Sequence, residues 1–305
     1  MTLTDLRYLV ALARERHFGR AAKKCHVSQP TLSVAIKKLE EQLGVLLFER
    51  SAAEVKITEI GQRVVEQARK VLLEAAQIGE IVASGKDPLA GPLRLGVIYT
   101  IGPYLLPRLI PRVHELAPKM PLFIQENYTA RLTESLKRGE LDVIVISLPF
   151  EEQGIVTRVI YDEPFRVLLP SGHPWEATTD IRPDMLADDQ LLLLGAGNCF
   201  RDQVLEVCPH CRTGSGLQRT LEGSSLETIR LMVATGVGIT VLPYTSVSGY
   251  AYPSDLLSVR PFEAPAPTRM VALAWRKSFP RQRVIALLAE AIRACPLGEA
   301  VRLLE

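Results

Sequence analysis

The sequence predicts an α/β protein whose N-terminal part is rich in helix and carries one small β-hairpin. Three observations support this fold class. Apolar residues recur at helical spacing from residue 4 to residue 43, a linker with two Gly and two Pro spans residues 84–92, and short apolar runs alternate with helical stretches beyond it. Such alternation is typical of α/β layers, here expected to be parallel. A chain of 305 residues with 47% hydrophobic content is long enough for two or three domains.

The first three predicted helices form a helix-turn-helix unit. Residues 4–14 and 18–25 carry apolar residues on one side, and a short turn ends at Ser28, which is placed to cap the next helix. Pro30 is tolerated in a first helical turn, and Gly44 is placed to end the helix. The apolar stripe of this third helix consists of Leu32, Ile36, Leu39 and Leu43.

A β-hairpin and a long helix follow. Residues 47–50 and 55–57 predict two short strands with residues 51–54 at their tip, which makes the unit a winged helix-turn-helix. Thr58 is placed to cap the long helix, whose apolar seam is Ile60, Val64, Ala68, Val71, Ala75, Ile78 and Val82. Such a seam commonly pairs two chains, although it also suits a helix that lies on its own core.

Beyond the linker, short strands alternate with helices in two sets. Helices are expected around residues 104–116, 130–138, 226–234 and 284–295. The expected strands are residues 93–98, 122–125, 143–147, 165–169, 191–194, 239–242 and 270–275. A chain that builds one α/β lobe, crosses to a second and returns would place a ligand site between the lobes.

The expected domains follow from these elements. Residues 1–58 form the winged helix-turn-helix, 59–90 the dimerisation helix and hinge, and 91–305 the regulatory domain. Lobe I of that domain is expected to comprise residues 91–162 and 270–305, and lobe II residues 163–269.

The positive charge is concentrated at the N-terminal end. Residues 1–38 carry eight Lys or Arg and two Asp or Glu, a net charge of +6 in a chain whose total is +2. A basic head on a mildly acidic body indicates phosphate binding. The sequence shows no leader-like N-terminus and no apolar run of about 18 residues, so we expect a soluble, cytoplasmic protein without a membrane partner.

Five cysteines in a chain with no export signal do not predict a structural disulfide framework. Cys199, Cys208 and Cys211 fall within thirteen residues, a clustering that indicates metal or redox chemistry. Thiolate attack on a peroxide gives a sulfenic acid, which a second thiol converts to a disulfide. Arg201 is close enough in sequence to assist Cys199 if local geometry turns it toward the sulfur. Cys25 and Cys295 are expected to be inert.

The head carries four runs of residues that together resemble a known family: Phe18-Gly-Arg-Ala-Ala22, Ser28-Gln-Pro-Thr-Leu-Ser33, Ile36-Lys-Lys-Leu-Glu-Glu-Gln-Leu-Gly44 and Leu47-Phe-Glu-Arg50. They look like the head of LysR-type transcription regulators. The resemblance implies a winged helix-turn-helix, a dimerising helix and a two-lobed, periplasmic-binding-protein-like effector domain in a homodimer or homotetramer. It also implies promoter DNA and RNA polymerase as partners.

The same resemblance assigns the DNA-contacting residues. The helix after Ser28 would lie in the major groove of double-stranded promoter DNA, while Arg50 and the lysines would contact phosphate. The expected DNA-binding residues are Ser28, Gln29, Pro30, Thr31, Ser33, Val34, Lys37 and Arg50.

A second set of motifs resembles the peroxide-sensing OxyR branch of that family: Cys199-Phe-Arg-Asp-Gln-Val204 followed by Cys208, Tyr99-Thr-Ile-Gly-Pro-Tyr-Leu-Leu-Pro107, Asp162-Glu-Pro164, His173-Pro-Trp175 and Ser225-Leu-Glu-Thr-Ile-Arg230. The resemblance implies a non-enzymatic activator of the oxidative stress response that needs no cofactor and no metal. Cys199 would react with hydrogen peroxide and then form a disulfide with Cys208 across an eight-residue loop. The implied peroxide-binding residues are Thr100, Thr129, Asn198 and Arg269, with Asn198 standing where the branch often has a histidine.

Other interpretations remain open at this point. Cys208-Pro-His-Cys211 is a C-x-x-C unit, which allows a rival Cys208–Cys211 disulfide, or zinc held with Cys199 and His210. A second hypothesis keeps the LysR-type scaffold but makes the effector a small organic anion or aromatic molecule held between the lobes, with the cysteines incidental. A thiol peroxidase or zinc enzyme is the third hypothesis, against which the complete DNA-binding head weighs.

Overall fold

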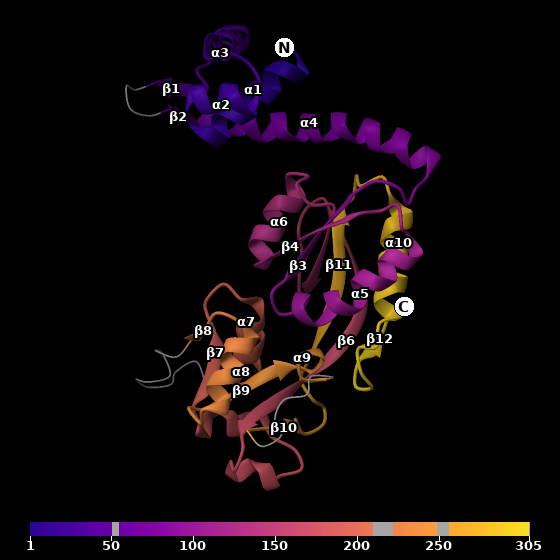
Figure 1. The fold of residues 1–305 in the computed structure, drawn as a ribbon. Coiled ribbons are helices and arrows are strands. Elements are labelled where there is room, and N and C mark those ends of the chain that lie inside the picture. The colour runs from indigo at the N-terminus through magenta and orange to yellow at the C-terminus, as the bar shows by residue number, and fades with distance from the viewer. Residues whose placement is uncertain (51–54, 210–221, 249–255, 305) are drawn as a thin grey trace. The chain divides into compact units, whose positions relative to one another are not determined.

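The structure is a computed structural model that describes residues 1–50, 55–209, 222–248 and 256–304. It divides into two compact units, Met1–Gly85 and Lys86–Glu305 (Figure 1). Each unit has its own hydrophobic core. Within the described residues, no helix combines the length and the apolar character that crossing a membrane requires.

Three short helices form the head of the first unit: α1 (Leu3–Glu15), α2 (Phe18–Lys24) and α3 (Gln29–Leu43). Each begins at a side-chain cap, from Thr2, His17 and Ser28 respectively, which satisfies N–H groups that lack partners within the helix. Gly44 ends α3 at φ +68°, a left-handed conformation that glycine adopts without strain. The predicted stripe of α3 is buried at Leu32, Ile36 and Leu39, whereas Leu43 stays partly exposed.

The wing strands β1 (Phe48–Arg50) and β2 (Val55–Ile57) pair antiparallel. The hydroxyl of Thr58 then accepts the N–H of Gly61 and caps α4 (Glu59–Lys86). Along α4, Ala68 packs into the head core, whereas Ile78 and Val82 are more than half exposed. One part of the predicted apolar seam therefore lies on the head itself, and its C-terminal part faces solvent.

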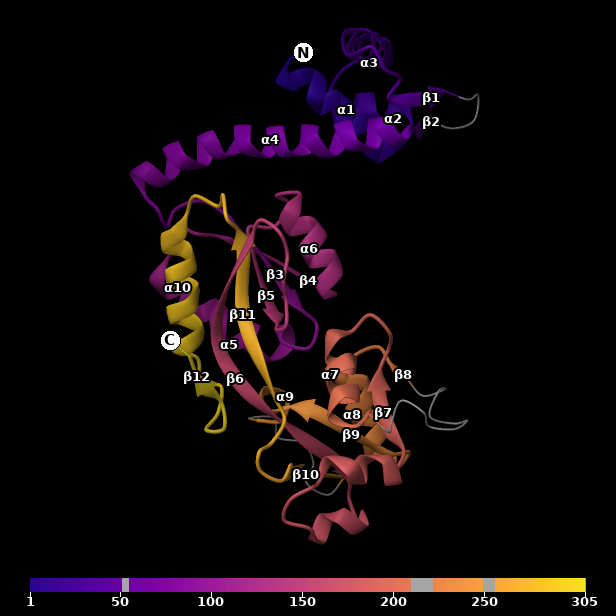
Figure 2. The ribbon, with the colours of Figure 1, turned by 180° about the vertical axis from the view of Figure 1, so that it is seen from behind.

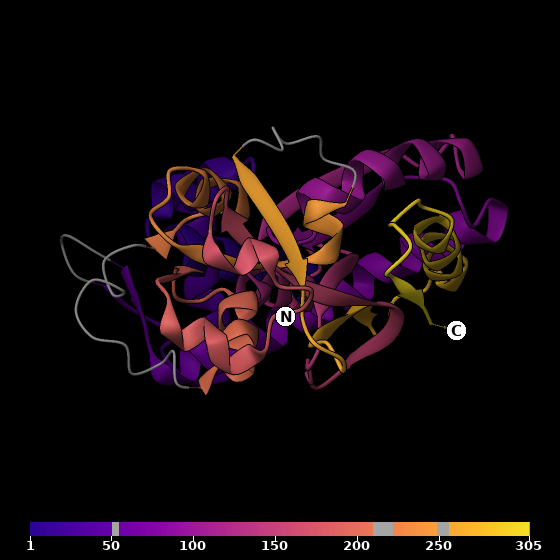
Figure 3. The ribbon, with the colours of Figure 1, turned by 90° about the horizontal axis from the view of Figure 1, so that it is seen from below.

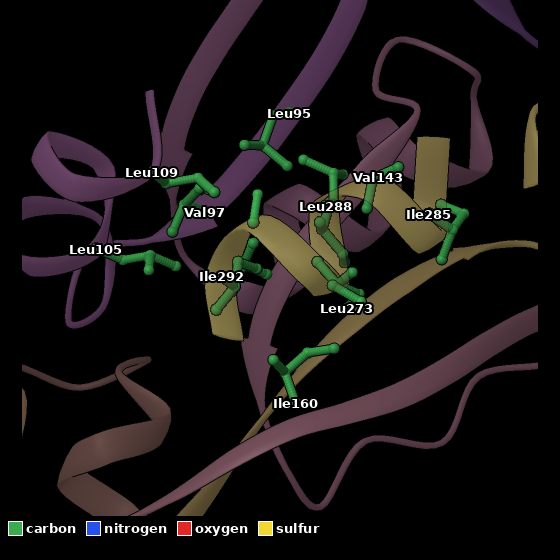
Figure 4. Packing of buried hydrophobic residues seen from close by; sticks show 14 of the residues in the cluster. Leu95, Val97, Leu105, Leu109, Val143, Ile160, Leu273, Ile285, Leu288 and Ile292 are labelled. Carbon is green, nitrogen blue, oxygen red and sulfur yellow. The ribbon is translucent and has the colours of Figure 1, made fainter. Parts of the chain in front are cut away.

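The first lobe of the second unit contains β3 (Leu93–Ile98), α5 (Gly102–Leu116), β4 (Leu122–Asn127), α6 (Thr129–Lys137) and β5 (Val143–Ser147). β3 pairs in parallel with both β4 and β5. Helices α5 and α10 (Gln282–Arg293) cover one face of this sheet, and α6 covers the other (Figure 2). Figure 4 shows the core between α10 and the sheet, where Leu288 and Ile292 meet Leu273 and Val97.

The second lobe contains the helices α7 (Cys199–Val207), α8 (Leu226–Ala234) and α9 (Tyr244–Val247), with 3-10 turns at Pro174–Ala177 and Pro183–Asp188. Its strands are β7 (Leu191–Leu194), β8 (Glu222–Gly223), β9 (Ile239–Pro243) and β10 (Leu257–Pro261). Its buried core includes Phe165, Leu192, Phe200 and Val241.

Two long strands carry the chain between the lobes. β6 (Ile155–Pro170) pairs antiparallel with β11 (Thr268–Arg276) near the first lobe, and with β9 and β10 in the second. The short strand β12 (Arg302–Leu303) also joins β6, close to the end of α10 (Figure 3). The expected parallel pairing is present within each lobe, among β3, β4 and β5 and among β7, β8 and β9, whereas β6 and β11 run antiparallel to their neighbours.

Two further expectations need correction. The predicted strand 165–169 is only the end of β6, whose earlier part carries polar residues and does not read as one apolar run. The eight residues between Cys199 and Cys208 were expected to be a loop, but they belong to α7, with Cys208 as its C-cap. Phe200 and Val204, one helical turn apart, are the buried residues that fix this helix to the second lobe.

Candidate functional site

The sulfur of Cys199 lies where α7 meets the first lobe. Cys199 is the first residue of α7, half-buried, and packs against the core of the first lobe. The hydroxyl of Thr129, the first residue of α6, donates to Cys199 Sγ at 3.6 Å. Asn198 precedes the cysteine as a buried N-cap whose side chain makes no capping bond. The structure thus places a free thiol, a hydroxyl and a buried amide side chain at one junction.

A second cluster fixes Thr100. Arg269 donates through Nη1 to Thr100 Oγ1 and through Nη2 to the Thr100 carbonyl, both at 2.9 Å, while its Nε donates to Glu163 Oε1 at 2.8 Å. Glu163 Oε2 accepts the backbone N–H of Thr245 at 2.8 Å. Arg269 and Glu163 have fully buried side chains, and a buried pair of this kind is tolerable only when its polar atoms are satisfied in this way.

These contacts specify what Arg269 does. Its guanidinium lies over the Phe200 ring, 5.3 Å from the ring centre, and its described hydrogen bonds go to Thr100 and Glu163. The sequence suggested Arg269 as a donor to peroxide. The structure shows that it also binds Thr100 and packs against the Phe200 ring of α7, while its role as a peroxide donor stays a prediction.

Arg201 points to a carbonyl rather than to the thiol in its described hydrogen bond, from Nη1 to the Leu194 oxygen at 2.7 Å. It therefore ties the first turn of α7 to β7. Glu163 is the residue whose part in this site the sequence reasoning missed. No local sequence pattern could have found it, because its partner Arg269 lies 106 residues further along the chain.

The two expected redox partners are apart. Cys199, Cys25 and Cys295 are free thiols, whereas Cys208 is disulfide-bonded and so has another partner than Cys199. Cys208 is 1% exposed in the core of the second lobe. His210 and Cys211, on which the zinc alternative depends, lie outside the described residues. Among the residues that the structure does describe, no group of three or more His, Cys, Asp or Glu could hold a metal ion.

The other two cysteines are set apart from the site by burial. Burial raises the pKa of the Cys25 thiol and also that of Cys295, where Arg112 and Arg108 offset part of the effect. A raised pKa lowers the thiolate fraction at neutral pH, and the thiolate is the reactive form. Both residues are therefore poor candidates for reaction with an oxidant.

The outer side of α3 presents the predicted DNA-reading surface. The exposed residues there are Ser28, Gln29, Pro30, Thr31, Val34 and Lys37, while Ser33 is half-buried. Ser28 also caps the helix by accepting the N–H of Thr31 at 3.2 Å. Small polar groups beside cations suit contacts with base edges and phosphates. The side chain of Arg50 is outside the described part of the chain.

Comparison with protein families gives two matches in this chain. Residues 3–62 match the bacterial regulatory helix-turn-helix protein, lysR family. Residues 86–295 match the LysR substrate binding domain.

The similar proteins agree on one branch. The DNA-binding transcriptional dual regulator OxyR of Escherichia coli K12 is 40% identical over 294 residues, which cover 96% of this chain and 95% of that protein. Full-length OxyR of Pseudomonas aeruginosa, a variant with Asp in place of a cysteine, is 55% identical with a TM-score of 0.81, covering 99% of this chain and 97% of that one. A hydrogen peroxide-bound Cys-to-Ser variant of Corynebacterium glutamicum OxyR is 32% identical with a TM-score of 0.64, covering 96% of this chain and 91% of that one.

Proposed function

The chain belongs to the LysR family of bacterial helix-turn-helix regulators, and on that premise we propose that it activates transcription in response to hydrogen peroxide, which it senses through Cys199. The observation that carries the proposal is the free Cys199 thiol at the junction of two lobes, with the Thr129 hydroxyl 3.6 Å from its sulfur. The relatives named OxyR support the same stimulus.

The first chemical step uses this pair of residues. The Cys199 thiolate attacks one peroxide oxygen, the O–O bond breaks, and the products are a Cys199 sulfenic acid and hydroxide, which takes up a proton to become water. The sulfur loses two electrons and the peroxide gains them. The Thr129 hydroxyl is close enough to the sulfur to donate to a peroxide oxygen there, and Thr100, Asn198 and Arg269 complete the proposed peroxide site.

The second step has to remodel α7. The Cys208 thiol displaces the sulfenic oxygen as water, which leaves a Cys199–Cys208 disulfide. Cys208 lies nine positions after Cys199 along α7, about 13.5 Å along the helix axis, whereas a disulfide requires Cα atoms about 4–7 Å apart. The bond therefore cannot form while α7 is intact, and its formation would convert a local oxidation into a change of fold.

The second step also requires Cys208 as a thiol. Because Cys208 is disulfide-bonded in the structure, that bond has to be reduced before Cys208 can resolve a sulfenic acid on Cys199. Its burial in the second lobe is a further barrier, since Cys208 has to leave the core to meet Cys199. The responsive state in this proposal is the fully reduced chain, in keeping with a cytoplasmic protein.

The proposed output of the switch is a change in how the protein binds DNA. The exposed side of α3 is proposed to enter the major groove of promoter DNA, with the lysines and Arg50 on phosphate. The exposed Val71, Ile78 and Val82 on α4 support pairing of two chains, and a homotetramer that contacts RNA polymerase completes the proposal. A change in the regulatory unit would then alter the spacing of paired heads on DNA.

The test is a footprint on target promoter DNA combined with mass mapping of disulfides. Full-length protein is reduced with dithiothreitol, desalted without oxygen and treated with hydrogen peroxide. The wild type should form the Cys199–Cys208 disulfide and change its footprint, and Cys199→Ser should do neither. Cys208→Ser should stop at the sulfenic acid, while Cys295→Ser serves as the matched control and should respond as the wild type does.

Two outcomes would replace this proposal. If Cys199→Ser leaves the footprint response to peroxide intact, the sensor lies elsewhere. If peroxide leaves the wild-type footprint unchanged and a small organic molecule alters it, the chain is a metabolite-responsive member of its family.

A further inference from the structure

Helix α7 is attached to the first lobe at two points on one face. Cys199 and Gln203 are four residues apart and therefore lie on the same side of the helix. The next stripe, Phe200 and Val204, faces the core of the second lobe. One side of α7 is thus held by its own lobe, and the neighbouring side meets the other lobe through a sulfur and an amide.

The amide contact is the more extensive of the two. Gln203 Nε2 donates to Ser147 Oγ at 3.0 Å and to the carbonyl of Leu148 at 2.9 Å. Both acceptors lie at the end of β5 in the first lobe, and Ser147 is only 4% exposed. While these bonds persist, α7 cannot leave the first lobe, so the Cys199 sulfur stays beside Thr129.

Two opposing contributions from Gln203 make the attachment of α7 to the first lobe weak enough to break. Gln203 Oε1 is buried and has no hydrogen-bond partner among the described residues, which costs part of what the two Nε2 bonds contribute. The net is of the order of one hydrogen bond, a factor of about five in an equilibrium or rate. A helix as short as α7 has little stability of its own, so a factor of this size affects whether it stays folded.

We propose that Gln203 is a positioning residue for the peroxide reaction: its bonds to Ser147 and Leu148 hold α7 so that Cys199 meets peroxide beside Thr129, and their rupture sets the rate at which the disulfide closes. This inference rests on the proposed function, since it assumes that Cys199 and Cys208 join. It assigns opposite effects to the two chemical steps. Losing the attachment should slow the attack on peroxide, because the thiol is less well placed, and should speed closure, because α7 unwinds more readily.

The experiment measures both steps in the reduced full-length protein after mixing with hydrogen peroxide, by acid quench and mass analysis of sulfenic acid and disulfide. Gln203→Ala should close the disulfide about fivefold faster than the wild type and form the sulfenic acid several-fold more slowly. Glu206→Ala is the matched control, an exposed residue on the same helix, and should leave both rates unchanged. Alanine is the better helix former, so faster closure in Gln203→Ala cannot come from lower helix propensity.

A second variant tests the hydrogen bond between Gln203 and Ser147 by itself. Ser147→Ala removes one acceptor and should speed closure about threefold, and the Gln203→Ala/Ser147→Ala double variant should close no faster than Gln203→Ala alone. This lack of additivity distinguishes a shared bond from general loosening. It also keeps the test decisive if Gln203→Ala folds poorly.

The possible results distinguish a failure of the Gln203 role from a failure of the proposed function. A closure rate within twofold of the wild type in both single variants, in a protein that does form the Cys199–Cys208 disulfide, overturns the role of Gln203 and leaves the proposed function standing. A wild type that never forms this disulfide removes the proposed function and this inference together. Equal acceleration of both steps would also contradict it, since positioning requires them to move in opposite directions.

Discussion

At the scale of single residues, the two threonines of the site differ in how they are held. Thr100 is 1% exposed, and its hydroxyl accepts a hydrogen bond from Arg269, so its orientation is fixed by a buried ion pair. Thr129 is half-buried and donates to the sulfur itself. Thr129 can therefore turn its proton to an incoming peroxide oxygen, whereas Thr100 forms a fixed part of the surroundings.

Replacing Thr129 by Val should lower the second-order rate constant of Cys199 with peroxide about tenfold, because it removes a hydroxyl beside the developing charge at nearly constant shape. Competition kinetics against a peroxidase of known rate measures this. Thr129→Ser retains the hydroxyl and should stay within about threefold of the wild type. A Val variant that reacts as fast as the wild type would mean that the hydroxyl does not assist the reaction.

Cys199, Cys25 and Cys295 should differ in their rates of alkylation and in how those rates depend on pH. Burial raises the pKa of Cys25 and of Cys295, so near pH 7 to 8 a smaller fraction of each is thiolate than in an unhindered thiol. Iodoacetamide labelling followed by peptide mass analysis should modify Cys199 first. The labelling rates of Cys25 and Cys295 should rise steeply as the pH increases toward their raised pKa values. Labelling of all three at one rate at neutral pH would contradict this.

The sequence predicted which residues belong to the site better than it predicted which side chains contact one another. The resemblance pointed to Cys199 and Thr129, and the structure brings them together. Arg269 was assigned to peroxide, yet its partners are Thr100 and Glu163, the latter 106 residues away in sequence. A buried ion pair between β6 and β11 leaves no local pattern, because only the fold brings its two halves together.

At the scale of elements, short-range sequence signals specify the helices of the head, whereas they do not specify α7. Caps at Thr2, His17 and Ser28 start the three head helices where side chains can accept backbone N–H groups, which is a short-range signal. Helix α7 spans nine residues, includes residues of modest helix propensity, and has no side-chain cap at Asn198. Its burial against the second lobe stabilises it, so the sequence alone favoured a loop.

The cap of α3 gives a prediction at this scale. Ser28→Ala removes the acceptor for the N–H of Thr31 and should lower the free energy of unfolding of the head by about 1 kcal/mol. Thermal unfolding followed by circular dichroism measures the loss. Ser28→Asp restores an acceptor and should recover the stability, although it should weaken DNA binding by placing a negative charge near phosphate. If Ser28→Ala is as stable as the wild type, the cap does not stabilise α3.

At the scale of the whole molecule, the regulatory unit is organised by strands that pass between the lobes. β6 contributes to the sheets of both lobes, and β11 returns the chain beside it. The alternation of short strands and helices predicted two lobes. It could not predict a strand of sixteen residues, because the polar residues along β6 interrupt its apolar run. Long-range pairing, rather than composition, defines how the lobes are joined.

Arg281 helps to hold the segment that leads into this unit, and this gives the last prediction. Arg281, 7% exposed, donates from Nη1 to the carbonyl of Pro92 at 2.8 Å and from Nη2 to that of Ala90 at 2.9 Å, with longer contacts to Gly91 and Pro88. The guanidinium thus binds the carbonyl groups of a short, partly buried stretch of backbone.

Arg281→Ala should therefore lower the free energy of unfolding of the regulatory unit by about 2 kcal/mol, because several hydrogen bonds from a charged donor to backbone carbonyls are lost. Both tryptophans of the chain, Trp175 and Trp275, lie in this unit, so urea unfolding followed by tryptophan fluorescence reports on it alone. Arg281→Lys should be intermediate, since an ammonium cannot reach several carbonyls with the planar geometry of a guanidinium. Arg283→Ala, at an exposed position in the first turn of α10, which Arg281 precedes as the N-cap, should leave the midpoint unchanged. Equal shifts in Arg281→Ala and Arg283→Ala would show that the loss comes from the surface charge of α10 and not from the carbonyls of the linker.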